Sequence, residues 1–495
     1  MRRGNLARAM AAASGVLLAL SACTSIPGDE LQTASLVISD VTAIDAVNRA
    51  RSDVDVVIMA EKIVAVGPDA GDGYRAEPGK RVNGSGKFLI PGLWDAHVHV
   101  TFDPDIDYRT FYPLSLAHGI TALRDTGGHL DKLAPARAAA GQPDTPDLFV
   151  AGPLLDGELR VYDGSSAFFK DISIGVPSPE EGRAAVDRLA AEGVAFIKAY
   201  EMLAPDTFRA IVDQARMHGL PVSAHVPLSM TVAEAIDAGV DDLQHLRNLE
   251  FECAANSSAL VAERQAMLEA GPAAADVPSA GALRGHIHGQ QRQGALSSQD
   301  PQACETLIAV LADNGVFQTP TSHLNAGQVK QWYLTDEWRE TFNMLPLELR
   351  ARALQLTDRE KQEPSPETLR YFEWNRATLA RMEQAGVPLM AGTDAPILFM
   401  TPGISLHAEL AQMVENGVSP IRALEAATVG PARFFGIENE RGTIATGMKA
   451  DLVLLAANPL DDIRNTQAIV AVVKDGALHD RSALDGMVKS VGNRP

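Results

Sequence analysis

The chain has 495 residues, of which 43 are basic and 63 are acidic, giving a formal net charge of −20. An acidic balance of this size repels a phosphate backbone and argues against a nucleic-acid partner. The length exceeds one ordinary domain. We therefore expect a large domain with a small companion, acting on a small molecule.

Residues 1–22 have the pattern of a targeting signal. A basic start leads into an apolar run, Ala9–Leu20, which is too short to span a bilayer comfortably. The run ends in Leu20-Ser-Ala-Cys23, which resembles a bacterial lipobox. We expect cleavage and lipidation at Cys23, and therefore a lipoprotein at the periplasmic face of the envelope. By resemblance to Gram-negative lipoproteins, Thr24 predicts the outer membrane. The alternative is a transmembrane anchor.

Short β-rich runs lie near both ends of the chain. Neither group alone offers a large core, so one β-sandwich built from both termini is the economical solution. We expect this domain over residues 35–90 plus 436–490, after a linker at 23–34. Its predicted strands are Leu36–Asp45, Val54–Met59, Lys62–Val66, Ala450–Leu455 and Ile469–Lys474.

Between these groups, eight apolar runs alternate with helix-like stretches over residues 91–435. This alternation is typical of parallel strands joined by crossover helices, and eight strands close a (β/α)8 barrel. The predicted fold class is therefore α/β, a TIM barrel with a small β-sandwich. The predicted barrel strands are Leu93–His99, Ile120–Asp125, Asp147–Gly152, Val194–Ala199, Pro221–His225, Asp241–His245, Val316–Thr319 and Val387–Thr393.

Candidate metal ligands fall at the carboxyl ends of the predicted strands, where barrel active sites assemble. His97 and His99 are two apart on one strand and share a face. The other candidates are Lys198, His225, His245 and Asp394. The same spacing in His286-Ile-His288 lies in a Gly/Gln-rich loop with no strand around it, and it does not indicate a second metal site.

One connection, from His245 to Val316, is unusually long and contains both cysteines that remain after Cys23. Cys253 and Cys304 are an even pair in a compartment that permits disulfides. A bridge between them and two buried thiols are the alternatives.

The sequence resembles the amidohydrolase superfamily through its strand-end motifs. They are Phe88-Leu-Ile-Pro-Gly-Leu-Trp-Asp-Ala-His-Val-His99, Phe196-Ile-Lys-Ala-Tyr200, Ser223-Ala-His-Val-Pro227, Leu243-Gln-His245, Ala391-Gly-Thr-Asp-Ala-Pro396 and the late segment Gly442–Val453. The strand around Lys198 looks most like the branch of prolidase-like and Xaa-Arg/Lys dipeptidases and imidazolonepropionase-like hydrolases.

This resemblance implies a two-metal site, with Zn2+ as the expected metal. His97, His99 and Asp394 would hold one ion and His225 and His245 the other. Lys198, carboxylated by CO2 to a carbamate, would bridge them. The alternative is a structural lysine paired with an acid.

The implied activity is hydrolysis of a C–N amide bond in a dipeptide or N-acyl amino acid, with Asp394 as ligand and general acid/base. Tyr200 either polarises the substrate carbonyl or fills the barrel rim. His323 and His407 are weaker candidates for substrate contact. Arg124 and Arg247 lie near strand ends, but neither is singled out as a carboxylate-binding residue.

Two other functions remain open at this stage. One is a mononuclear, imidazolonepropionase-like cyclic amidohydrolase or deaminase in which Lys198 stays unmodified. The other is a non-catalytic lipoprotein that binds envelope ligands in the barrel.

Overall fold

The computed structural model describes residues 31–103, 105–166 and 169–494. The predicted signal peptide, the lipidation site Cys23 and most of the linker lie outside these ranges. Within the described ranges, no helix combines the length and apolar character that crossing a membrane requires.

Parallel strands form a barrel at the centre of the molecule. Backbone hydrogen bonds join neighbouring strands, including Ala195 N to Val150 O at 2.8 Å, which connects the two hydrogen-bonded sheets of the barrel. In order around the barrel the named strands are β8 (Leu93–Val98), β9 (Ile120–Asp125), β10 (Asp147–Val150), β13 (Ile197–Ala199), β14 (Val222–Ala224), β15 (Asp242–Gln244) and β16 (Phe317–Thr319).

The structure corrects the prediction of the eighth strand. Residues 387–393 form no continuous strand; single bridges instead join Leu389 to Gln318 and Ala395 to Val98. Pro388 has no N–H to donate to a ladder, although its carbonyl accepts from Gln318 N at 2.9 Å. The segment still closes the barrel, because Ala96 N donates to Ala391 O at 2.8 Å.

Two short strands that the sequence pattern did not indicate follow β10. Strand β11 (Leu154–Asp156) pairs in parallel with both β12 (Ser173–Gly175) and β13. They extend the sheet beyond the carboxyl end of β10. Tyr162 and Ile172, in the connection between them, line a cavity at the barrel mouth.

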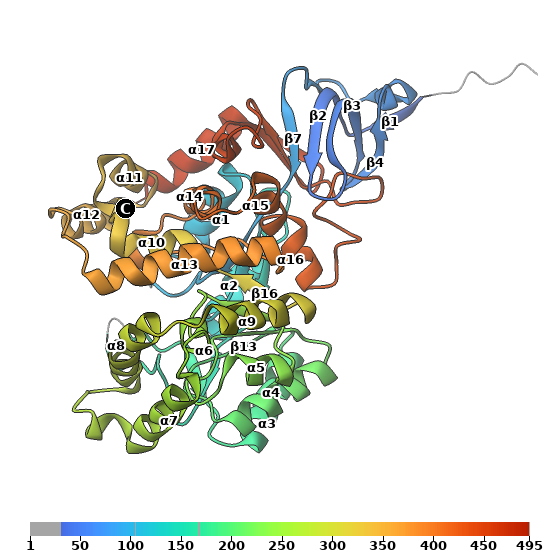
Figure 1. Cartoon of the computed structure of the whole chain (residues 1–495). Helices are drawn as coiled ribbons and strands as arrows, with labels where there is room; N and C mark the ends of the chain where they lie inside the picture. The colour runs from blue at the N-terminus through green and yellow to red at the C-terminus, as the bar shows by residue number, and fades with distance from the viewer. Residues whose placement is uncertain (1–30, 104, 167–168, 495) are drawn as a thin grey trace, which may run out of the picture.

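The chain termini build the second domain, a β-sandwich that stands beside the barrel (Figure 1). Its main sheet has the order β19-β18-β17-β7-β2-β3-β4, with β6 paired to β2, and β1 pairs with β5. The strands are β1 (Gln32–Ala34), β2 (Leu36–Asp45), β3 (Arg49–Met59), β4 (Lys62–Gly67), β5 (Tyr74–Ala76), β6 (Arg81–Asn83), β7 (Phe88–Pro91), β17 (Leu452–Leu455), β18 (Ile469–Lys474) and β19 (Ala477–Asp480).

Helices surround the barrel and begin at clear local signals. Ser178 and Thr231 cap two of them through side-chain bonds to backbone N–H groups, and Ser419-Pro420 opens another. The crossover helices include α1 (Tyr108–Ala117), α2 (Leu130–Ala139), α3 (Pro179–Ala191), α4 (Pro205–Met217), α5 (Val232–Ala238), α9 (Pro301–Asp313), α13 (Pro366–Ala385), α14 (Ile404–Glu415), α15 (Pro420–Ala426) and α16 (Val429–Phe434), and α17 (Arg481–Gly492) ends the chain.

Two connections carry additional helices at the barrel mouth. The long connection after β15 contains α6 (Leu249–Glu252), α7 (Ser257–Ala274) and α8 (Ala280–Ser297), and it leads into α9. The connection after β16 contains α10 (Ser322–Lys330), α11 (Asp336–Thr341), a short 3-10 turn η3 (Phe342–Met344) and α12 (Leu347–Leu356). In Figure 1 these two groups lie on different sides of the barrel.

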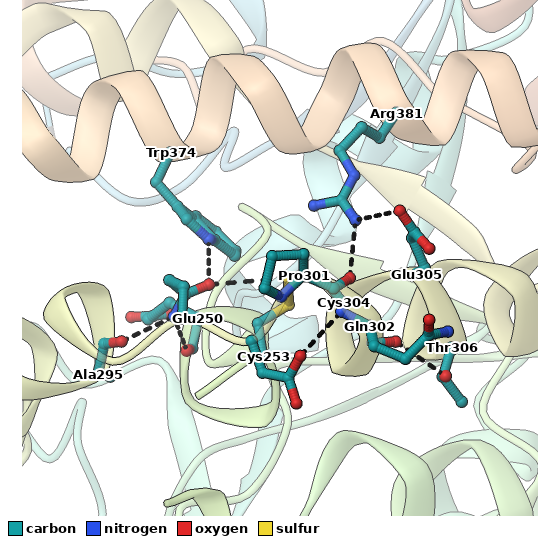
Figure 2. Close-up of a disulfide and its surroundings, with 12 residues drawn as sticks. Glu250, Cys253, Ala295, Pro301, Gln302, Cys304, Glu305, Thr306, Trp374 and Arg381 are labelled. Atoms are coloured by element: carbon teal, nitrogen blue, oxygen red, sulfur yellow. Dashed lines mark hydrogen bonds and ion pairs between the residues drawn. A yellow bond between two sulfur atoms is a disulfide. The ribbon is translucent and has the colours of Figure 1, made fainter. Parts of the chain in front are cut away.

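A disulfide joins Cys253, just after α6, to Cys304 in α9 (Figure 2). Helix α13 packs over the bridge, where Arg381 donates to Pro301 O at 3.2 Å. Trp374 of the same helix donates to Gln299 Oε1 at 2.7 Å. The start of the long connection is therefore fixed against the barrel's outer helices.

Candidate metal centre

All six predicted ligands lie at the carboxyl ends of barrel strands, and their side chains line one small cavity. Because parallel strands of a barrel end on one face, residues separated by about three hundred positions in sequence meet there. Each of the six is at most 7 % exposed. They are His97, His99, Lys198, His225, His245 and Asp394.

Two of these ligands leave their strands in the left-handed region of backbone space. The φ angles of His245 and Asp394 are 63° and 64°, values that few residues other than glycine adopt. Conformations of this kind concentrate at functional sites, where the surrounding structure holds them. They turn the chain away from the strand while the side chains face the cavity.

Asp394 lies between His97 of β8 and His99, which directly follows that strand. Its Oδ1 atom is 3.3 Å from His97 Nε2 and 3.2 Å from His99 Nε2. Burial alone would raise the pKa of Asp394, but the neighbouring imidazoles outweigh it, and the pKa lies well below its usual value. The carboxylate is therefore ionised, the form that binds a cation.

Three of the histidines are oriented through Nδ1. His99 Nδ1 lies 3.0 Å from Gly127 O, His225 Nδ1 lies 2.6 Å from Glu201 Oε1, and His245 Nδ1 lies 2.7 Å from Thr321 Oγ1. Partners of this kind fix the ring and leave Nε2 for a metal. All three histidines line the shared cavity.

The donor set fits a metal ion. One ligand atom from each of His97, His245 and Asp394 lies within 4.8 Å of the others. Asp394 Oδ1 is buried without a conventional hydrogen bond among the described residues, and such an acceptor is costly unless something pairs with it. Burial lowers the pKa of His97 to about 4, so its imidazole is neutral and able to coordinate.

Lys198 is buried at 1 % exposure on β13. Its Nζ atom contacts Gln244 Oε1, and within the described ranges it forms no ion pair. Burial lowers its pKa to about 7. The expected alternative, a structural lysine paired with an acid, therefore has no supporting contact.

Tyr200 lines the same cavity as the six ligands. Its ring centroid is 4.4 Å from that of His225, and its hydroxyl accepts from Arg284 Nη1 at 3.4 Å. Burial raises its pKa well above the usual value. It is a neutral phenol that can donate a hydrogen bond.

A charged cluster lies next to His225 and was not predicted from the sequence. Glu201 accepts from Arg247 Nη1 at 3.1 Å and lies 3.8 Å from Arg284 Nη1. One carboxylate thus faces two guanidinium groups, which hold its pKa at about 2 against the effect of burial. Arg284 comes from α8, in the segment expected to be a loop, so no strand-end pattern pointed to it. The one sequence signal for this cluster was Arg247, which lies two residues after His245.

His323 and His407 do not line the metal cavity; they border a separate one with Trp332 and Trp338. His407 Nε2 lies 3.0 Å from His118 O, and the His323 ring stacks on Trp332 at 4.2 Å. These contacts are structural. The predicted substrate contact through either residue is therefore not supported.

Arg124 is also structural. It is fully buried and pairs with Asp242 Oδ2 at 2.8 Å beneath the site. Its neighbour Asp125 accepts from Val100 N at 2.7 Å and Gly127 N at 3.2 Å within the turn. Neither side chain borders the metal cavity.

A (β/α)8 barrel with four histidines, a lysine and an aspartate at its strand ends defines a class of metal-dependent hydrolases. Residues 88–478 match the model of the amidohydrolase family, and the chain belongs to that family. It is an enzyme that acts on carbon–nitrogen bonds.

Individual relatives are distant. Ochratoxinase of Aspergillus niger is 23% identical over 449 residues, covering 79% of this chain and 75% of that protein. Imidazolonepropionase of Thermoplasma acidophilum is 35% identical over 83 residues, which are 17% of this chain and 20% of that protein. The structure of a Xaa-Pro dipeptidase with methionine bound in its active site has a TM-score of 0.59 at 20% identity, covering 90% of this chain and 99% of that one. The last likeness shows the shared fold.

Proposed function

We propose that this enzyme hydrolyses the amide bond of a dipeptide or N-acyl amino acid, using two zinc ions. The observation that carries the proposal is the shared cavity in which four histidines, Lys198 and Asp394 meet beside a phenol and an arginine pair. The likeness to a dipeptidase that binds an amino acid in its active site supports the substrate class.

The ligands divide into two groups. His97, His99 and Asp394 would hold one ion, and His225 and His245 the other. Ring centroids of His97 and His225 both lie 4.8 Å from that of His245, so the two groups adjoin. When bound, the ions would supply an acidified water nucleophile and polarise the scissile carbonyl.

Carboxylation of Lys198 would complete the bridge. Attack of Nζ on CO2 forms a nitrogen–carbon bond and releases one proton, leaving an anionic carbamate. A fully buried ammonium without an acid partner is costly, whereas an anion between cations is stabilised. Gln244 Oε1, which already contacts Nζ, would accept the N–H that the carbamate nitrogen keeps.

Asp394 would accept a proton from the attacking water and deliver it to the leaving amine, so that the amide becomes an acid and an amine. Tyr200, as a neutral phenol on the same cavity, would donate a hydrogen bond to the carbonyl oxygen as charge develops there.

The arginine pair supplies the partner for a substrate carboxylate. Arg247 and Arg284 share Glu201, so the cluster has more positive than negative charge. Guanidinium groups bind carboxylates by charge-assisted hydrogen bonds. Arg284 also contacts Tyr200, which places this positive charge at the edge of the metal cavity.

For its location, we propose the periplasmic face of a bacterial envelope, through a lipid on Cys23. The support is the lipobox-like sequence that ends at this residue.

The decisive experiment is metal quantification on the purified protein, followed by a library of dipeptides and N-acyl amino acids that includes methionine and proline. Two ions per chain, bicarbonate-dependent activity and release of free amino acid are expected. One ion and indifference to bicarbonate would favour the mononuclear cyclic amidohydrolase or deaminase. A fully metallated protein inactive across amides, esters and lactones would favour the non-catalytic binding protein.

A further inference from the structure

A second, larger cavity adjoins the metal cavity. The two share Phe102, Tyr162 and Ile397 as lining residues, so they meet along one wall. The second cavity has a volume of about 460 Å³, compared with about 20 Å³ at the metal ligands. The small cavity holds little more than a water molecule, so most of any substrate must lie elsewhere.

The walls of this larger cavity, hereafter the apolar chamber, come from four connections at the barrel mouth. They are the loop after β8, the β11–β12 connection through Tyr162 and Lys170, the turn after Asp394, and the η3–α12 segment after β16. The apolar lining side chains include Ile106, Phe342, Leu345, Leu349, Ala353 and Met400. These six are at most 8 % exposed and form the buried part of the chamber, whereas Leu356, 54 % exposed, lies where it opens to solvent.

Few charges border the chamber, and they lie toward its edge. Arg352 of α12 pairs with Asp103 Oδ2 at 2.8 Å and with Asp105 Oδ2 at 2.6 Å, which also ties α12 to the loop after β8. Lys170 Nζ lies over the Phe102 ring, 4.9 Å from its centroid. The interior therefore favours an apolar occupant.

The metal cavity thus has two flanks of different character. The arginine pair lies beside Tyr200, whereas the apolar chamber begins at Phe102, Tyr162 and Ile397. A substrate that satisfies both flanks has a carboxylate at one end and a large apolar group at the other. The scissile amide would lie between them, at the metals.

We propose that the apolar chamber receives the aliphatic acyl chain of an N-acyl amino acid and selects substrates by the length of that chain. This inference rests on the proposed function and narrows it, because an ordinary dipeptide would leave most of the chamber unfilled. The amino-acid carboxylate faces Arg247 and Arg284. The acyl chain leaves the site as a carboxylic acid and the amino acid as a free amine.

The test is a series of N-acyl-L-methionines with acetyl, butyryl, hexanoyl and octanoyl chains. Each methylene that moves from water into the chamber should raise kcat/KM about threefold, so the six methylenes between acetyl and octanoyl should raise it by about 700-fold. A series flat to within about twofold would overturn the inference.

Two variants test whether the dependence on chain length arises in the apolar chamber. Ala353→Phe places a ring in the chamber and should lower kcat/KM for the octanoyl substrate about tenfold or more, while the acetyl substrate changes by less than about twofold. Ala351→Phe makes the same change at an exposed position of α12 and should leave the whole series unchanged. If Ala353→Phe does not fold, Leu349→Ala, which enlarges the chamber, should move the preferred chain to a longer acyl group.

The outcomes separate the two proposals. Hydrolysis of the acetyl substrate without a chain-length effect would overturn the acyl-chain inference and leave the proposed function standing. No hydrolysis of any member by the metallated enzyme, with or without bicarbonate, would count against both. An equal fall in kcat/KM on all substrates in Ala353→Phe would overturn the placement of the acyl chain in the chamber.

Discussion

Glu201 Oε1 lies 2.6 Å from Nδ1 of His225, on the neighbouring strand of the barrel. The carboxylate is fully buried and ionised, because the surrounding arginines hold its pKa at about 2. It therefore accepts the Nδ1 proton and directs Nε2 of His225 toward the cavity. His225, a proposed ligand, and Glu201 form one unit in which Glu201 is the proposed positioning residue.

Glu201→Gln should weaken metal binding at the His225 site. The amide keeps the shape of the side chain but loses the charge that orients the imidazole, and loss of such a partner costs about 10- to 100-fold in metal affinity. Titration of the metal-free protein with Zn2+ measures the effect. Glu250→Gln is the matched control, because Glu250 is equally buried and pairs with Arg292 Nε at 2.8 Å, away from the ligands. Equal affinities in both variants would contradict the positioning role.

Asp394→Asn should lower kcat by at least about a hundredfold, the usual effect of losing a general acid/base. Asparagine can still offer an oxygen to a cation but cannot carry the transferred proton. Metal content must be measured on the same sample, because Asp394 is also a proposed ligand. Full turnover in a variant that retains its metals would refute the role.

The barrel and the convergence of the six candidate side chains were predictable because both depend on local periodicity. Once the strands are parallel, a histidine at a strand end such as His225 must lie at the carboxyl face of the barrel. The closing segment departed from the pattern, since single bridges at Leu389 and Ala395 take the place of a continuous strand. Arg284 was not predictable, since it reaches the site from a helix inside a long insertion, and neither its spacing nor its residue type marks it.

Residue type alone also suggested a functional role for His407 that its contacts do not support. His407 follows Asp394 closely in sequence, but it lies in α14, where Thr466 and His118 satisfy its ring. A histidine near a motif is as often a packed core residue as a functional one. Contacts made across the fold decide between these roles, and a single sequence does not contain them.

Lys198→Ala should remove activity and lower metal content, because it deletes the proposed bridge. A short carboxylic acid such as propionate should restore part of both, since it can occupy the vacated space as an anion. Lys198→Arg is the control, because a guanidinium fills the space but cannot form the carbamate, so added acid should not restore its activity. Full activity of Lys198→Ala without added acid would contradict carboxylation and favour the mononuclear site.

Arg284→Met should raise KM for N-acyl amino acids by about 10- to 150-fold, the loss expected for a hydrogen bond between charged groups. The matching substrate with a carboxamide in place of the carboxylate should be affected far less. Arg292→Met, on the same helix but paired with Glu250, is the control. Equal losses on both substrates would indicate that Arg284 supports Tyr200 and does not bind a carboxylate.

The stability of the fold should fall on acidification, partly because of His407. Burial lowers the pKa of this imidazole from about 6.5 to about 3. The unfolded chain therefore binds a proton below about pH 6.5, and the folded chain does not until about pH 3, so lower pH favours unfolding. At pH 5 this one group should cost about 2 kcal/mol relative to pH 7.5. Urea denaturation of wild type and His407→Gln across this range measures the difference, since glutamine can donate to His118 O without titrating. His286→Gln, at a position in α8 that is not buried, should keep the wild-type profile, and a His407→Gln protein that loses stability as steeply as wild type would show that other groups govern the acid response.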